Sequence, residues 1–313
     1  MAPLTRIDVH HHYFPSSLMK EWKGTSDWPM PNNNEKWTPA VSIAAMDKLG
    51  IQKAILSAPN STDSAHDVNL DASKIVAQHP DRFGFFATLP LGNASMDVIL
   101  EELRFALDDL KADGIAMVSS YGVGPDAKYV GHDDFEPLWQ ALHERKAIVF
   151  LHGDQTKHAN APPGNVLPIP IVEVPNETYK AAASLVTSGK KRKYSGAKII
   201  LSHSGGSTPF LACRAAVLAN YVGNTLFGTS LTIDELLEDF KSFYYETALS
   251  GYDVNLAALQ KFVAQDHILF GTDFPAVTVD MARWFTENLD GYFANDQSSH
   301  TAVMTENWKR LQN

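Results

Sequence analysis

The stretch Ala147-Ile148-Val149-Phe150-Leu151-His152 stays apolar until it ends in a histidine. A strand with one wet face would alternate apolar and polar side chains, so this run is typical of a parallel strand covered on both faces. Similar short runs, rich in β-branched or aromatic residues, recur along the chain and predict eight strands in all. The other seven are Ile7 to His12, Lys53 to Ala58, Phe83 to Leu89, Gly114 to Val118, Lys198 to His203, Phe243 to Glu246 and Ile268 to Asp273.

Segments with helical spacing separate these runs. The clearest predicted helices are Met96 to Lys111, Phe135 to Arg145, Thr178 to Ser188 before Gly189, and Leu211 to Tyr221 before Gly223. Strand and helix therefore alternate along 313 residues, which indicates an α/β protein. We expect one domain over residues 1–313, a (β/α)8 TIM barrel with long βα loops covering its C-terminal face. A doubly wound open sheet has the same alternation, and periodicity alone does not exclude it.

Two long connections follow predicted strands, Pro15 to Asn34 and His158 to Pro175, and the second is rich in proline. Loops of this length are uncommon in compact domains unless they cover a site. We therefore expect both to lie over the carboxyl ends of the strands. The apolar part of the second, Val166 to Val174, favours a small aromatic ligand over a sugar or a peptide.

Composition restricts the function. The 26 Lys and Arg residues are outnumbered by 36 Asp and Glu residues, giving a net charge of -10, which disfavours binding to nucleic acid or to an anionic membrane surface. No apolar run is long enough to span a membrane. The single cysteine, Cys213, cannot form an intrachain disulfide, and the first residues lack the features of a signal peptide. We expect a cytoplasmic protein that acts on a small molecule.

Polar side chains stand at the ends of several predicted strands. His10 and His12 alternate along the first strand, so their side chains share a face. His152, His203 and Asp273 end three other runs. In a barrel, the carboxyl ends of the strands form the active site, so these five side chains are expected to meet there.

Three imidazoles and a carboxylate are ligands that suit zinc, ahead of manganese or iron, and they leave a position open for water or substrate. The predicted strand Gly114 to Val118 contains no lysine to bridge two ions, which favours a single divalent ion. No glycine-rich dinucleotide fingerprint follows a strand, so no organic cofactor is expected. Asp8 has two interpretations that the sequence leaves open: it orients His10 or His12, or it faces solvent or caps a helix.

Beyond these strand ends, the chain resembles the amidohydrolase-2 family, which contains aminocarboxymuconate semialdehyde decarboxylase and decarboxylases of γ-resorcylate, 5-carboxyvanillate and 6-methylsalicylate. The resemblance covers nearly the whole length. The matching stretches are His79-Pro80-Asp81-Arg82-Phe83, Phe135-Glu136-Pro137-Leu138-Trp139, Pro175-Asn176-Glu177-Thr178, and Gly205-Gly206 with Pro209 and Arg214. The family's usual Asn-Ala ending is altered here to Asn307-Trp308-Lys309-Arg310.

The resemblance implies a TIM barrel with His10, His12, His152 and Asp273 as metal ligands and His203 beside the ion. It also implies that Arg214 reaches into the neighbouring subunit of a homodimer and binds a substrate carboxylate there. In the aminocarboxymuconate branch, arginines stand in the helix after the first long loop. Ser42 and Ala44 occupy those places in this chain, which disfavours the muconate substrate.

By the same resemblance, we expect a carboxy-lyase that decarboxylates a small aromatic ortho-hydroxy acid without oxidation, with 6-methylsalicylate giving 3-methylphenol as the specific guess. Asp273 would donate the proton to the ring, and His203 would stabilise the phenolate. The first alternative is a metal-dependent hydrolase of a lactone or amide, with His203 as base. The second is a barrel that binds a ligand without catalysis.

Overall fold

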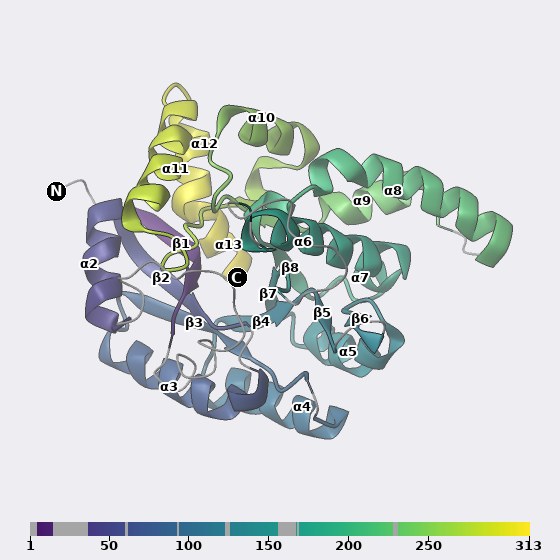
Figure 1. The fold of residues 1–313 in the computed structure, drawn as a ribbon, viewed down its shortest axis with the longest axis horizontal. Coiled ribbons are helices and arrows are strands. Elements are labelled where there is room, and N and C mark those ends of the chain that lie inside the picture. The colour runs from purple at the N-terminus through teal and green to yellow at the C-terminus, as the bar shows by residue number, and fades with distance from the viewer. Residues whose placement is uncertain are drawn as a thin grey trace.

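The structure of the protein is a computed structural model that describes residues 5–14, 37–59, 62–92, 94–122, 126–155, 167, 169–227 and 231–313. Eight parallel strands form one sheet in chain order, each beside its neighbours in sequence (Figure 1). They are β1 (Arg6–His12), β2 (Ile51–Ser57), β3 (Phe83–Thr88), β4 (Gly114–Val118), β7 (Ile148–His152), β8 (Lys198–Leu201), β9 (Tyr244–Glu246) and β10 (Ile268–Leu269). A small antiparallel pair, β5 (Ser120–Tyr121) and β6 (Lys128–Tyr129), follows β4.

The sheet closes between its first strand and the segment after its last. The Val9 N–H donates to the Phe270 carbonyl at 3.0 Å, and the Asp273 N–H donates to the His10 carbonyl at 2.9 Å. A further bond runs from His12 N–H to the Phe274 carbonyl at 2.8 Å. These bonds make a nearly closed barrel, so the (β/α)8 prediction is confirmed and the open sheet is excluded.

Helices surround the barrel (Figure 1). They are α2 (Pro39–Leu49), α3 (Ala65–Gln78), α4 (Met96–Arg104), α5 (Glu136–Glu144), α6 (Ile169–Thr187), α7 (Lys190–Lys193), α8 (Thr208–Val222), α9 (Ile233–Lys241), α10 (Asp253–Phe262), α11 (Val279–Tyr292), α12 (Gln297–Thr301) and α13 (Asn307–Gln312). Among the helices in the described part of the chain, none has both the length and the apolar content that crossing a bilayer requires.

The structure differs from the prediction at the second long connection, where a helix starts earlier than expected. Residues predicted as loop up to Pro175 belong to α6, which begins at Ile169, whereas the prediction began it at Thr178. Pro170 stands in the first turn of α6, where the N–H group that proline lacks would have no partner in the helix. Pro175 removes a hydrogen bond inside the helix, and burial of apolar residues on the same helix, such as Val174, compensates for this loss. The first long connection and residues 156–166 lie outside the described residues.

Two glycines expected to end helices behave differently. Gly189, two residues after the end of α6 at Thr187, adopts a left-handed φ of 74°. Gly223 keeps a right-handed helical φ of -59°, and the chain continues through a π-helical turn, Gly223–Phe227. Glycine permits a left-handed stop but does not impose one.

The end of the barrel opposite the polar strand ends is filled by α13. Trp308 is 2% exposed and packs against Phe86 inside the barrel, with ring centroids 5.8 Å apart. The Asn307 side chain donates to the Ile268 carbonyl at 2.8 Å, and Lys198 donates to the Leu311 carbonyl at 2.6 Å. The altered C-terminal stretch therefore forms the floor of the barrel.

Replacing Trp308 by alanine will destabilise the fold by about 3–5 kcal/mol, because it leaves a cavity in the barrel floor. The change is measured as the loss of unfolding free energy in urea. Trp284→Ala is the matched control, since Trp284 is 51% exposed on α11 and should cost about 1 kcal/mol or less. Equal losses in the two variants would contradict the assignment of Trp308 to the floor.

Candidate metal centre

Four side chains from three places in the barrel meet at the carboxyl ends of the strands. His10 and His12 lie on β1, His152 ends β7, and Asp273 follows β10. One ligand atom from each lies within 4.8 Å of the others, and all four residues are buried. The alternation of β1 places His10 and His12 on this face as the sequence predicts, while His11 points the other way.

The Nδ1 atom of each of the three histidines has a polar partner, which orients the ring so that Nε2 points into the group of four residues. The His10 Nδ1 lies 2.8 Å from Glu246 Oε1, and the His152 Nδ1 lies 2.8 Å from the Gly153 carbonyl. Both partners only accept hydrogen bonds, so Nδ1 carries the proton and Nε2 keeps its lone pair. The His12 Nδ1 has the Ser57 hydroxyl at 3.4 Å.

Asp273 completes the group. Its Oδ1 lies 3.1 Å from the Nε2 atoms of both His10 and His12. Oδ1 is buried yet forms no hydrogen bond with any residue that the structure describes. A buried oxygen without a donor beside two imidazole nitrogens is the arrangement in which all three point at a shared ion. The residues present therefore fit one divalent transition metal ion.

The electrostatics of the group favour the metal-binding form at His152 and Asp273, whereas at His10 they favour a second ring proton on Nε2 that a metal ion would displace. Burial lowers the pKa of His10, but attraction to Glu246 and Asp273 outweighs it and raises that pKa to about 10. Burial holds the pKa of His152 well below its usual value, and repulsion from His203 adds to the effect. Burial raises the pKa of Asp273, but the charge on His10 outweighs this and holds that pKa well below its usual range. At neutral pH, Asp273 is a carboxylate and His152 a neutral imidazole.

His203 lies beside this group on a strained turn. Its Nε2 is 3.5 Å from Asp273 Oδ2, while its Nδ1 is buried and has no hydrogen-bond partner among the described residues. His203 and Ser204 both have a φ of 54°, a left-handed conformation that is rare outside glycine. This turn ends β8 at Leu201, two residues before the predicted end. Strained residues of this kind are concentrated at functional sites.

Gly206 lets the turn fit. A Cβ at this position would collide with the carbonyl oxygen of Pro175 on α6. A glycine is thus required where α6 passes over the turn that carries His203.

Asp8 fits neither of its two interpretations. It is fully buried and accepts hydrogen bonds from the backbone of His10 at 3.1 Å and of Thr272 at 3.0 Å. Its Oδ2 lies 2.9 Å from Nδ1 of His11, whose Nε2 in turn lies 2.8 Å from the Ser42 hydroxyl. Asp8 therefore joins β1 to the segment that carries Asp273 and orients His11.

Arg214 lies exposed on α8. The part of the chain that the structure describes gives it no hydrogen bond or ion pair with the four candidate ligands. Ser42, which stands where an arginine would serve a second substrate carboxylate, is fully buried and bonded to His11 and to Trp37.

Sequence reasoning missed Glu246, the last residue of β9. It is fully buried and bonded to His10, and it also accepts a hydrogen bond from the backbone N–H of His203. The rule that singled out the other five side chains, a polar residue at the end of an apolar strand, applies to Glu246 as well.

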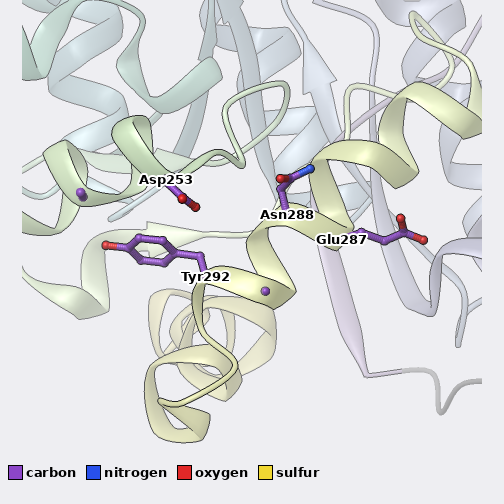
Figure 2. Close-up of a pocket in the computed structure, with 6 residues that line it drawn as sticks. Asp253, Glu287, Asn288 and Tyr292 are labelled. Carbon is purple, nitrogen blue, oxygen red and sulfur yellow. The ribbon is translucent and has the colours of Figure 1, made fainter.

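A separate surface groove of about 670 Å³ lies between α10 and α11, and its lining includes none of the candidate ligands. Figure 2 shows Asp253 on α10 across from Asn288 and Tyr292 on α11, with Glu287 of α11 pointing away from it. The buried group is therefore the candidate for chemistry.

Comparisons with known proteins agree with this geometry. A family model described as Amidohydrolase matches residues 7–311. The chain is 39% identical to "Decarboxylase macB" of Penicillium terrestre, over 93% of this chain and 90% of the relative. It is 35% identical to "6-methylsalicylic acid decarboxylase acuB" of Aspergillus aculeatus, over 90% of this chain and 87% of the relative.

Among solved structures, a dihydroxybenzoic acid decarboxylase from Polaromonas sp. JS666, with bound manganese and the inhibitor 2-nitroresorcinol, matches with a TM-score of 0.80 and 22% identity. That match covers 98% of this chain and 96% of the other. At this identity it supports the fold alone. Together with the family match over residues 7–311, the barrel and its group of three histidines and one aspartate show that the chain belongs to the amidohydrolase family.

Proposed function

We propose that this protein is a metal-dependent carboxy-lyase that decarboxylates a small aromatic ortho-hydroxy acid without oxidation, and that 6-methylsalicylate is converted to 3-methylphenol and carbon dioxide. The observation that carries the proposal is the buried group of His10, His12, His152 and Asp273 in a chain whose relatives, matched over nine-tenths of its length, are named decarboxylases. In this proposal, residues 1–313 form one catalytic domain. The chain contains a single cysteine, which supports a cytoplasmic location.

We propose that the four ligands hold one divalent ion, zinc, with manganese as the alternative. Three imidazoles and a carboxylate suit zinc, whereas a solved neighbour was found with manganese. Held by these four residues, such an ion would supply Lewis-acid chemistry to the carboxylate and phenol groups of the substrate.

The protein's own residues supply the proton. Decarboxylation replaces a bond between the ring and the carboxylate by a bond to hydrogen, so a proton must reach that ring carbon, and the electrons of the broken bond restore aromaticity as carbon dioxide leaves. Asp273 donates this proton. Because the pKa of Asp273 lies well below its usual range, the residue is a carboxylate before the reaction. It therefore first takes the proton that the substrate's phenol loses on becoming the phenolate, then passes it to the ring carbon, and the product phenolate regains a proton from water. His203, 3.5 Å from Asp273, stabilises the phenolate oxygen.

The test is carbon dioxide release by the purified, metal-loaded protein from 6-methylsalicylate, γ-resorcylate, salicylate and orsellinate. We expect turnover with 6-methylsalicylate above the other three. Absence of turnover across the four acids would contradict the substrate class. Hydrolysis of a lactone or amide without carbon dioxide release would instead favour the hydrolase alternative.

We also propose that the protein acts as a homodimer joined through α8, with Arg214 binding the substrate carboxylate in the neighbouring subunit. The helix projects from the body of the barrel (Figure 1). It exposes an apolar surface that water disfavours, formed by Phe210, Val217, Leu218, Tyr221 and Val222. Arg214 is exposed on the same helix, so a second copy that covers this surface would receive its side chain.

Charging this surface with the double change Leu218→Asp and Tyr221→Asp will convert the dimer to a monomer, because the interface would then bury two unpaired carboxylates from each subunit. Light scattering coupled to gel filtration measures the mass, and a carbon dioxide assay should show lost turnover. Val98→Asp is the control, since Val98 is 49% exposed on α4 and should leave the mass unchanged. An unaltered mass in the double variant would contradict the proposed interface.

A further inference from the structure

Glu246 has an unusual set of contacts for a side chain so far from solvent. Its Oε1 lies 2.8 Å from His10 Nδ1 and also accepts the backbone N–H of His203. Its Oε2 accepts the Ala248 N–H at 2.6 Å. The residue is fully buried, so these three donors replace water around the carboxylate. One carboxylate thus touches both the metal group and the residue beside it.

The surroundings leave Glu246 one place to lie. A Cβ at Gly271, in the segment after β10, would collide with Glu246 Oε2. The hydroxyl of Ser204 donates to the Glu246 backbone carbonyl at 3.5 Å, which ties the same residue to the turn after β8. Glu246 is therefore fixed between β1, the turn after β8 and the segment after β10.

We propose that Glu246 is a positioning residue that sets two functional side chains together, His10 for metal binding and His203 for turnover. Glu246 accepts a hydrogen bond from the Nδ1–H group of His10, and this bond orients the ring so that the lone pair of Nε2 is directed toward Asp273 and His12. Glu246 also accepts a hydrogen bond from the backbone N–H of His203, which stabilises the left-handed turn that brings His203 Nε2 to 3.5 Å from Asp273 Oδ2.

The second role follows from the strain of the turn. A non-glycine residue at a φ of 54° is strained and persists only where neighbouring contacts enforce that conformation. The hydrogen bond from the His203 N–H to Glu246 holds the backbone of His203 in this strained conformation. A loss of this bond would let the turn relax and move His203 away from Asp273.

The tests are Glu246→Gln, whose NH2 group must face either the Ala248 N–H or the His10 and His203 donors, and Glu246→Ala, which removes both acceptor oxygens and should show the same effects more strongly. Calorimetry with Mn²⁺ or Zn²⁺ on the apoprotein should show affinity about 10–100-fold weaker than wild type. The visible spectrum of the Co²⁺-loaded variant should also differ, since His10 is reoriented. These two measurements use no substrate, so they hold or fail independently of the proposed decarboxylation.

Turnover tests the link to His203, and this arm rests on the proposed function. At a metal concentration that saturates each protein, Glu246→Gln should still show a kcat about 10–100-fold below wild type. Ser57→Ala is the matched control, because Ser57 contacts His12 Nδ1 but not His203. It should lose metal affinity and recover its kcat when metal saturates. Glu102→Gln, a buried carboxylate bonded to His66 and Asn69, controls for general destabilisation and should bind metal normally.

Two results would overturn the inference. Metal affinity of Glu246→Gln within twofold of Glu102→Gln would show that Glu246 does not position His10. Full recovery of kcat at saturating metal, as expected for Ser57→Ala, would show that it does not position His203.

Discussion

Alanine at His152 or at Asp273 will leave the purified protein without its divalent ion and will remove measurable turnover. Each residue offers one of four donor atoms that lie within 4.8 Å of one another, and three remaining donors hold an ion far more weakly. Loss of Asp273 also removes the proposed proton donor, and general acid catalysis contributes about 10²–10⁴-fold to the rate.

Metal content by inductively coupled plasma mass spectrometry is the direct measurement, with carbon dioxide release alongside it. His132→Ala is a suitable control, because the His132 side chain is 46% exposed and lies outside the group. Full metal content in both the His152 and the Asp273 variants would refute the assignment of ligands.

Alanine at His203 will separate binding from chemistry. The four ligands stay in place, so metal content should match wild type, whereas kcat should fall by about 10²–10⁴-fold because no imidazole remains to stabilise the developing charge. His66→Ala is the control for removal of an imidazole, since His66 is 58% exposed and bonded to Glu102. A His203 variant that keeps wild-type kcat would contradict the role given to this residue.

The sequence predicts the barrel well because buried parallel strands have a simple signature. The run at Gly114 to Val118 is apolar on both faces and lies as a strand where the pattern places it, whereas the predicted strand Lys198 to His203 ends at Leu201, two residues early. The candidate ligands were found for the same reason: a histidine or aspartate that interrupts an apolar run has few structural purposes at a strand end.

The features that were missed depend on contacts between distant parts of the chain. Glu246 and His10 are 236 residues apart, and only the closed sheet brings β1 beside the residues after β10 and close to β9. Asp8 likewise meets Thr272 across this closure. The start of α6 was missed because Pro170 and Pro175 weaken local helical preference, while burial of residues such as Val174 supports the helix.

The position of α13 has a consequence for synthesis. Trp308 and Leu311 fill the floor of a barrel whose first strand is made roughly 300 residues earlier, and Asp273 meets β1 only after β10 exists. A nascent chain that has emerged as far as β9 has an unpaired edge along β1 and an open interior. The set of four candidate ligands is therefore complete only once Asp273 has been made, and until then the edge along β1 stays unpaired.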